Sequence, residues 1–535
     1  MKPNLFSRSS VAPQRPTRRR PSRILQHGQR RVFASWILVP LILLTFAVAL
    51  RAQFTYTVTN DTVTITGYAS SGGDVTLPST IDGLPVTSIG DRALQCLYSL
   101  TNLTIPDSIM SIGNGAFTYC RNLTNVTIGS NVTNIGDSAF EGCTSLINVM
   151  FPTSVIRIGT SAFGGCTGLT NVMLPVSAAS IGNSAFNGCV GLRNILIPND
   201  VISIGAGVFS GCTGLTNVTI GESVIEIGAA PFQQCTNLMA VTVDPLNSVI
   251  SCAGGVLFNQ SQTVLYEYLA GNAGASYTIP KSVTKVGSSA FSGCNSLRNI
   301  TIPNSVISIG DGAFYYCRNL TSVTIPNSVT NIGSYAFYCC FGLTNATIGN
   351  SVSSIGDHAF CYCTSLTSVV VGSSVVSVGD DAFAWCNGLP SITIPESVSS
   401  FGYGVFVDCY LLRSVYCKGN APSGDDPNLF YCAGDGTVYY LPGTIGWGPT
   451  FGGRPTMLWK PQVQTTDANF GMRGNQFGFN VTGTVDIPVV LEASTNLASP
   501  VWSPLRSMTL TNGLVYFSDP QWTNYPGRFY RLRAP

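Results

Sequence analysis

The sequence has few charged residues and almost no histidine. Only 10% of the 535 residues are charged, against about 25% in an average soluble domain. Of the two histidines, only His358 lies beyond residue 52. No G-x-S-x-G, H-E-x-x-H or phosphate-binding loop motif is present. The most common general base is therefore nearly missing, and we expect no catalytic residue, no cofactor and no metal site.

The basic residues are concentrated at the N-terminus. Ten of the 27 Lys and Arg residues lie in residues 1–52, where there is no Asp or Glu, so residues 53–535 carry 17 basic and 25 acidic residues and a net charge of −8. No basic stripe remains to bind DNA, RNA or an anionic lipid surface. Thr, Ser and Asn take the place of charged residues in the rest of the chain.

Residues 1–52 have the composition of a secretory signal. A 15-residue apolar run, Trp36 to Leu50, follows the basic stretch, and a membrane span needs about 20 residues. Small residues (Ala47, Ala49 and Ala52) follow or end this run, so we expect cleavage near Ala52. An uncleaved membrane anchor is the alternative. Either way, the predicted location is secreted or at the cell surface.

Most of the chain consists of copies of one 23-residue unit, seen clearly from Gly310: G-x-x-A-F-x-x-C-x-x-L-x-x-V-x-I-P-x-S-V-x-x-I. The leading glycine recurs at Gly90, Gly113, Gly136, Gly159, Gly182, Gly205, Gly228, Gly287, Gly310, Gly333, Gly356, Gly379 and Gly402. A cysteine recurs with it at Cys96, Cys120, Cys143, Cys166, Cys189, Cys212, Cys235, Cys294, Cys317, Cys340, Cys363, Cys386 and Cys409. The cysteine spacing is also 23, except for one step of 24 between the first two. A fixed period in the twenties with Leu and Ile at set positions indicates a leucine-rich-repeat solenoid.

Each copy predicts two short strands and one helical turn. In the copy from Gly136, alternation around Val149 predicts a strand that ends at Pro152, and residues 154–158 predict a second extended piece. The Ala-Phe-x-x-Cys segment predicts a single helical turn. Asp137, Asp311, Asp357 and Asp380 would cap such turns at the N-terminus. Glycines such as Gly142 and Gly165 would close them in a left-handed conformation.

This unit resembles the BspA-like leucine-rich repeat of bacterial surface proteins over residues 54–460. The resemblance implies a secreted or surface-bound protein that is not an enzyme and that adheres to proteins, host matrix or other cells. It names no ligand and provides no catalytic residue. The partner we expect is an extracellular protein or cell-surface ligand, with membrane contact only through an uncleaved N-terminal segment. A passive spacer of the envelope or matrix is the alternative function.

We predict five parts around this repeat. Residues 1–52 form the signal peptide, 53–89 an N-terminal cap with a hairpin over 54–68, and 90–460 the solenoid. Within the solenoid, 244–280 is a variant insertion with a hairpin, and 410–460 is the C-terminal cap. Residues 461–535 form a small antiparallel β module that resembles a sandwich.

Two sets of residues are candidate sites. In four consecutive copies, large aromatic residues stand just before the cysteine, and we predict that Tyr315, Tyr316, Tyr338, Tyr362 and Trp385 form one ligand-binding patch. A purely structural aromatic ladder is the alternative. The second set is Cys417 and Cys432, which lie outside the repeat and could form a disulfide in an exported protein. The thirteen repeat cysteines are expected to form one column of buried thiols.

Overall fold

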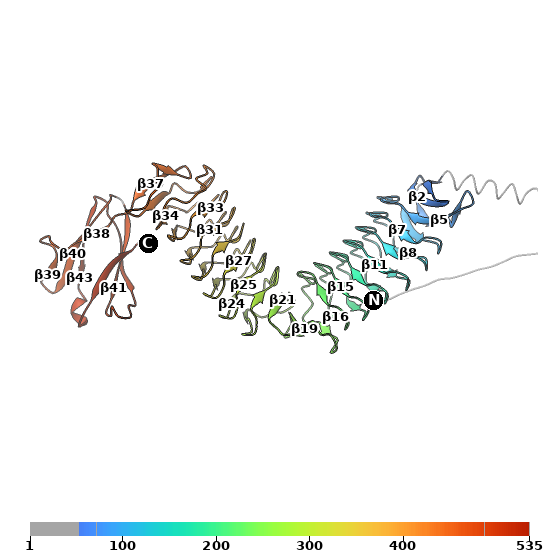
Figure 1. The fold of residues 1–535 in the computed structure, drawn as a ribbon, viewed down its shortest axis with the longest axis horizontal. Helices are drawn as coiled ribbons and strands as arrows, with labels where there is room; N and C mark the ends of the chain where they lie inside the picture. Colours follow the sequence, from blue (N-terminus) through green and yellow to red (C-terminus); the bar gives the residue numbers. More distant parts are fainter. Residues whose placement is uncertain (1–52, 71, 486, 534–535) are drawn as a thin grey trace, which may run out of the picture. The chain divides into compact units, whose positions relative to one another are not determined.

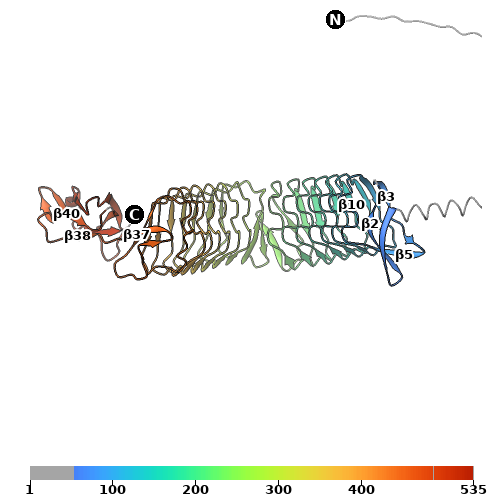
Figure 2. The ribbon, with the colours of Figure 1, turned by 90° about the horizontal axis from the view of Figure 1, so that it is seen from above.

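Each repeat of the chain makes one coil of a solenoid, and successive coils lie side by side (Figures 1 and 2). The computed structural model describes residues 53–70, 72–485 and 487–533. The predicted signal peptide lies outside the described residues. Phe54–Pro535 forms one compact unit. Within the described ranges, there is no helix of the length and apolarity that a membrane crossing requires.

Three sheets line the two sides of the coils in the first half of the solenoid, and the strands of successive regular coils pair in parallel. One sheet contains β1 (Phe54–Thr59), β2 (Thr62–Tyr68), β4 (Thr80–Ile81), β5 (Leu84–Ile89), β7 (Ser111–Ile112), β9 (Asn134–Ile135), β11 (Arg157–Ile158), β13 (Ser180–Ile181), β15 (Ser203–Ile204) and β17 (Glu226–Ile227). The other side of the coils contains β3 (Gly73–Thr76), β6 (Leu100–Thr104), β8 (Asn125–Thr127), β10 (Asn148–Met150) and β12 (Asn171–Met173), followed by a separate sheet of β14 (Asn194–Ile197), β16 (Asn217–Ile220) and β18 (Thr242–Val243).

The second half repeats this arrangement. One sheet contains β19 (Ile250–Ala253), β20 (Val256–Asn259), β21 (Val264–Tyr268), β23 (Lys285–Val286), β25 (Ser308–Ile309), β27 (Asn331–Ile332), β29 (Ser354–Ile355), β31 (Ser377–Val378) and β33 (Ser400–Phe401). The other side contains β22 (Ser276–Thr278), β24 (Asn299–Thr301), β26 (Ser322–Thr324), β28 (Asn345–Thr347) and β30 (Ser368–Val370), and then β32 (Ser391–Ile394), β34 (Ser414–Cys417), β35 (Thr437–Tyr440), β36 (Thr450–Phe451) and β37 (Arg454–Leu458).

The pairing register equals the repeat length. Val149 of β10 pairs with Val126 of β8 and Val172 of β12, each 23 residues away. Because every coil therefore places the same repeat position at the same point, each apolar position becomes a continuous column. The phenylalanines show this most clearly: Phe140 and Phe163 are fully buried, with ring centroids 5.2 Å apart and planes within 7°.

The predicted helical turn is wrong: a run of tight turns takes its place. Residues 90–409, all of which the structure describes, contain no helix. In the coil from Gly136, the N–H groups alternate between two kinds of acceptor. Ser138, Phe140 and Gly142 donate to the carbonyl oxygens of Thr160, Ala162 and Gly164 in the next coil (2.7 Å each), whereas Ala139, Glu141 and Cys143 donate to the residue three positions earlier in their own coil. A helix would need all these N–H groups within one coil, so stacking of coils replaces it.

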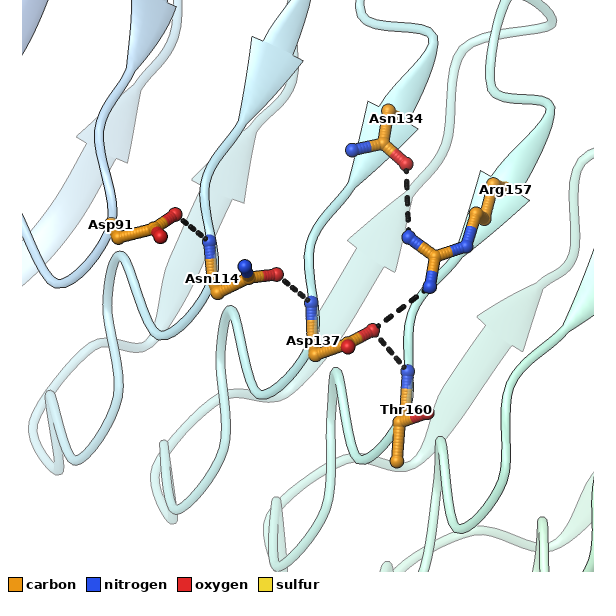
Figure 3. A network of polar contacts seen from close by, with 6 residues as sticks. All are labelled: Asp91, Asn114, Asn134, Asp137, Arg157 and Thr160. Carbon is orange, nitrogen blue, oxygen red and sulfur yellow. Dashed lines mark hydrogen bonds and ion pairs between the residues drawn. The ribbon is translucent and has the colours of Figure 1, made fainter.

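The aspartates after the turn glycine connect coils and do not cap helices (Figure 3). The Oδ1 atom of Asp137 accepts a hydrogen bond from the Thr160 N–H of the next coil (2.9 Å) and forms an ion pair with Arg157 (3.1 Å). The Oδ1 atom of Asn114 likewise accepts a hydrogen bond from the Asp137 N–H of the next coil (2.8 Å). The capping interpretation was wrong because the segment after the glycine is not a helix, and the carboxylate accepts the N–H of the neighbouring coil instead.

The cysteine column has twelve members, not the predicted thirteen. From Cys120 to Cys409 each thiol is buried and donates to a backbone carbonyl oxygen of the preceding coil at 3.0–3.5 Å. Cys96 is exposed and has a φ of 57°, which is the conformation of Tyr119 in the next coil. Leu97 therefore occupies the cysteine position of the first coil, and this explains the step of 24.

The two hydrophobic cores of the solenoid meet at the variant coil. The first core extends to Ile250, Leu257 and Leu269, and the second begins at Val256, so residues of the variant coil belong to both cores. Strands β20 and β21 form the predicted antiparallel hairpin, and β21 then continues in parallel with β23. The insertion is therefore part of the stack, where its third strand takes the place of a regular coil strand.

The described residues before and after the regular coils are also β structure. Strands β1 and β2 form the predicted N-terminal hairpin. In residues 410–460, β34, β35 and β37 extend the parallel sheet, so this region contains irregular further coils. The C-terminal module has one sheet of β38 (Gln462–Gln464), β39 (Gly471–Arg473), β40 (Gln476–Thr482) and β43 (Leu514–Asp519), and one of β41 (Pro488–Ser494), β42 (Ser503–Thr509) and β44 (Phe529–Arg533), with a 3-10 helix η1 (Trp522–Asn524). Side chains of both sheets share one core.

Candidate functional site

Aromatic side chains of five consecutive coils form a continuous surface on the turn side of the solenoid. We call this surface the aromatic ridge and define it by Tyr315, Tyr316, Tyr335, Tyr338, Phe341, His358, Tyr362, Trp385 and Tyr410. Tyr315 stacks on Tyr338 (5.2 Å, 8°) and Tyr362 stacks on Trp385 (5.1 Å, 11°). An edge contact between Tyr338 and Tyr362 at 5.7 Å joins the two stacks. The structure thus brings together the five aromatic residues selected from the sequence.

Sequence analysis missed four members of the ridge. Tyr335 (41% exposed) stacks on His358 with centroids 4.7 Å apart, and Tyr410 (47% exposed) meets the edge of Trp385. Phe341 meets the ring of Tyr316 edge-on. These residues occupy the third and ninth positions of the repeat, which flank the pre-cysteine positions only after the chain turns. A column-by-column comparison of the copies would have found them, because aromatics are rare there in other coils.

His358 is partly buried in this surface and is not a simple surface residue. Its Nε2 atom lies 3.4 Å from Oδ2 of Asp381 in the next coil. Burial raises the pKa of the Asp381 carboxyl, and the neighbouring His358 opposes that effect. Tyr335, His358 and Asp381 therefore form a line across three coils.

Three large residues of the ridge occupy a left-handed backbone position. Tyr316, Tyr362 and Trp385 have φ values of 57°, 60° and 60°. In five other coils the same position is glycine (Gly142, Gly165, Gly188, Gly211 and Gly293), and in the remaining five it is Cys96, Tyr119, Gln234, Cys339 or Asp408. A non-glycine residue in this region costs roughly 1–2 kcal/mol, so the ridge residues are held at an energetic cost that glycine avoids.

Two further thiols lie beneath the ridge. Cys339 and Cys361 are both 3% exposed, and the Cys339 N–H donates to the carbonyl oxygen of Cys361 (2.9 Å). Burial raises the pKa of both thiols, that of Cys361 to about 12. A hydrogen bond with Cys339 is the largest cause that raises the pKa of the Tyr316 hydroxyl. Both thiols are therefore neutral and buried next to the ridge residues.

The other candidate sites are separate from this surface. Cys417 is buried in β34, whereas Cys432 is exposed, and the structure does not join them in the predicted disulfide: both are free thiols. Within the described ranges, no group of three or more His, Cys, Asp or Glu residues is arranged to hold a metal ion.

The fold and the conserved geometry of its coils define a leucine-rich-repeat solenoid. The model of the BspA type leucine-rich repeat region matches residues 87–195, 133–262, 270–387 and 330–433. Together these matches span more than half of the chain, and the protein belongs to this family. No curated protein matches the chain.

Several solved structures are similar to this chain. A leucine-rich repeat protein from Bacteroides ovatus ATCC 8483 is 26% identical, with 76% of this chain and 98% of that chain covered and a TM-score of 0.46. A leucine-rich cell surface protein from Faecalibacterium prausnitzii A2-165 is 25% identical, with 72% and 93% covered and a TM-score of 0.48. The pneumococcal vaccine antigen PcpA is 20% identical, with 68% and 91% covered and a TM-score of 0.45.

Proposed function

We propose that this protein is an exported, non-catalytic scaffold that binds an extracellular protein through the aromatic ridge. The observation that carries the proposal is the presence of Tyr316, Tyr362 and Trp385 at left-handed positions where five other coils have glycine. Strained residues that the fold does not require are concentrated at functional sites. Tyr and Trp also provide large contact areas with few rotatable bonds.

Family membership supports a location outside the cytoplasm, as does the N-terminal segment. Mass spectrometry of the protein recovered from culture fluid and from washed cells tests this part of the proposal. We expect a mature N-terminus near Ala52 in one of these fractions. An intact chain confined to the cytoplasm would contradict export.

Glycine substitution is the sharpest test of the ridge, because glycine already fills the same position in other coils. The full chain and the variant Tyr316→Gly/Tyr362→Gly/Trp385→Gly are immobilised and exposed to biotinylated extracellular proteins. We expect the wild type to capture a defined protein that the variant does not capture. Tyr119→Gly is the matched control, since Tyr119 has the same repeat position and a φ of 59° but lies outside the ridge.

A passive spacer is the second candidate function. The face-to-face stacking of Tyr315 on Tyr338 favours it, because a stacked ladder also stabilises neighbouring coils. This function predicts that no protein is captured, or that capture is unchanged in the folded triple variant. Either result would refute binding through the ridge.

A further inference from the structure

The coils that carry the ridge are acidic as well as aromatic. Residues 310–424, the five coils of the ridge, contain Asp311, Asp357, Asp380, Asp381, Glu396 and Asp408, and three basic residues other than histidine, Arg318, Arg413 and Lys418. Most of these carboxylates are at the second, third or seventh position of a coil, next to the ridge residues. A partner that covers this surface would therefore be steered by opposite charge.

Two of the carboxylates lie at the Trp385 end of the ridge. Asp408 is the residue of the next coil that is equivalent to Trp385, and it is only 9% exposed. Its Oδ1 atom accepts a hydrogen bond from the Tyr410 hydroxyl (3.0 Å). Burial, Cys361 and Cys339 have the larger effects in raising the pKa of the Tyr362 hydroxyl, and Asp408 and Asp381 both add to them, so both carboxylates act on the same part of the ridge.

Neither of these two carboxylates forms an ion pair with a Lys or Arg side chain. Within the parts of the chain that the structure describes, the ion pair of Asp381 is with His358, and no ion pair involves Asp408. A buried carboxylate is normally paired with a cation or fully hydrogen-bonded. The Trp385 end of the ridge thus combines an aromatic surface with negative charge that the chain itself leaves without a basic partner.

The opposite end of the ridge shows how this surface accepts a cation. There the guanidinium of Arg318 lies 5.2 Å from the ring centroid of Tyr316 and 5.8 Å from that of Phe341, within the range of a cation–π contact. At the Trp385 end, the residue equivalent to Arg318 is Asn387 in one coil and Tyr410 in the next. The aromatic environment is repeated, but no arginine occupies this position. The nearby Arg413 donates to the backbone carbonyl oxygen of Tyr410 (3.4 Å), and among the described residues it forms no ion pair with Asp381 or Asp408.

We propose that Asp381, Trp385, Asp408 and Tyr410 bind an Arg or Lys side chain of a basic segment in the extracellular protein partner. This proposal rests on the proposed function and specifies the chemistry of its partner. Carboxylates of Asp381 and Asp408 receive the charged hydrogen bonds, and Trp385 and Tyr410 surround the cation's apolar part. A sugar that needs an open ring face fits less well, because Tyr362 already covers one face of Trp385.

The test measures binding of a fluorescein-labelled nona-arginine peptide to the full chain by fluorescence anisotropy. Asp381→Asn/Asp408→Asn removes both charges at positions where φ is 51° and 57°, and asparagine tolerates this conformation. We expect about tenfold weaker binding in this variant. The control Asp61→Asn/Asp200→Asn removes the same charge from exposed positions outside the ridge, and we expect less than a twofold change.

Equal weakening in both variants would overturn the proposal, because it would mean that only net charge attracts the peptide. The protein captured by the wild-type chain separates this failure from failure of the proposed function. If that protein is lost in the triple glycine variant but retained by Asp381→Asn/Asp408→Asn, the basic-segment proposal is wrong and the ridge function stands. If both variants retain it, both proposals are wrong.

Discussion

The backbone N–H of Phe232 donates a hydrogen bond to the Oε2 atom of Glu267, 3.0 Å away, at the junction of the two solenoid halves. In a regular coil the same N–H donates to a backbone carbonyl oxygen of the next coil, as Phe209 does to Pro231. The insertion displaces that carbonyl, and the carboxyl group of Glu267 replaces it. Glu267 is only 2% exposed, and its burial raises the pKa to about 8.

The burial of Glu267 predicts that stability falls as the pH rises from about 4.5 to about 8. The folded state holds the Glu267 proton up to the raised pKa, whereas the unfolded chain releases it near the ordinary value of about 4.3. The free energy of unfolding therefore decreases across that interval and levels off above it, by on the order of a few kcal/mol. Denaturant unfolding at pH 5 and pH 9 measures the difference.

Glu267→Gln keeps an acceptor for the Phe232 N–H and removes the ionisation. We expect this variant to be close to wild type at pH 5 and more stable than wild type at pH 9. Glu396→Gln, at an exposed acid, serves as the control and should leave the pH profile unchanged. A wild-type profile that Glu267→Gln does not flatten would contradict this account.

The cysteine column should contribute to stability through its hydrogen bonds. The Cys189 thiol donates to the carbonyl oxygen of Phe163 at 3.2 Å and is fully buried. Cys189→Ala removes this bond and leaves a small cavity, for an expected loss of about 1–3 kcal/mol. Thermal unfolding measures the effect. The exposed Cys432→Ala should change stability by less than about 0.5 kcal/mol, and equal effects at both sites would count against a role for the column.

The same burial predicts which thiols react. Cys96 and Cys432 are exposed and should be labelled by a maleimide in the native protein, as located by mass spectrometry. The thiols of the column should remain unlabelled, since burial raises the pKa of Cys120, Cys166 and Cys317 to about 12. Raising the pH from 7 to 9 should therefore not make these thiols react with the maleimide. Rapid native labelling of Cys166 would show that the stack opens.

Alanine substitutions at two glycines distinguish the effect of coil spacing on stability from the effect of backbone conformation. A Cβ atom on Gly182 would lie 2.6 Å from the backbone carbon of Gly159, so Gly182→Ala must push two coils apart. We expect a loss of at least about 3 kcal/mol. On Gly165 the nearest atom is 3.8 Å away and only the φ of +69° is unfavourable, so Gly165→Ala should cost about 1–2 kcal/mol. Urea denaturation of both variants tests the ranking; a reversed order would contradict the stacking geometry.

The sequence alone determined the coil and its interior. A strict period of 23 places Phe140, Cys143 and Val149 in the same surroundings in every copy, so their burial follows from the spacing without knowledge of the fold. The hairpins of residues 54–68 and of the variant coil were also predictable, since alternation and turn residues are local signals.

Only the tertiary structure decided what depends on the neighbouring coil. The segment Ala139–Cys143 has a helix-like pattern, but alternate N–H groups find acceptors 22 residues away and turns replace the helix. Asp137 likewise bonds to Thr160 and not to its own turn, and Leu97 displaces Cys96 from the column. The ridge gained Tyr335, His358 and Tyr410 in the same way, because residues from different coils become neighbours only when the chain stacks on itself.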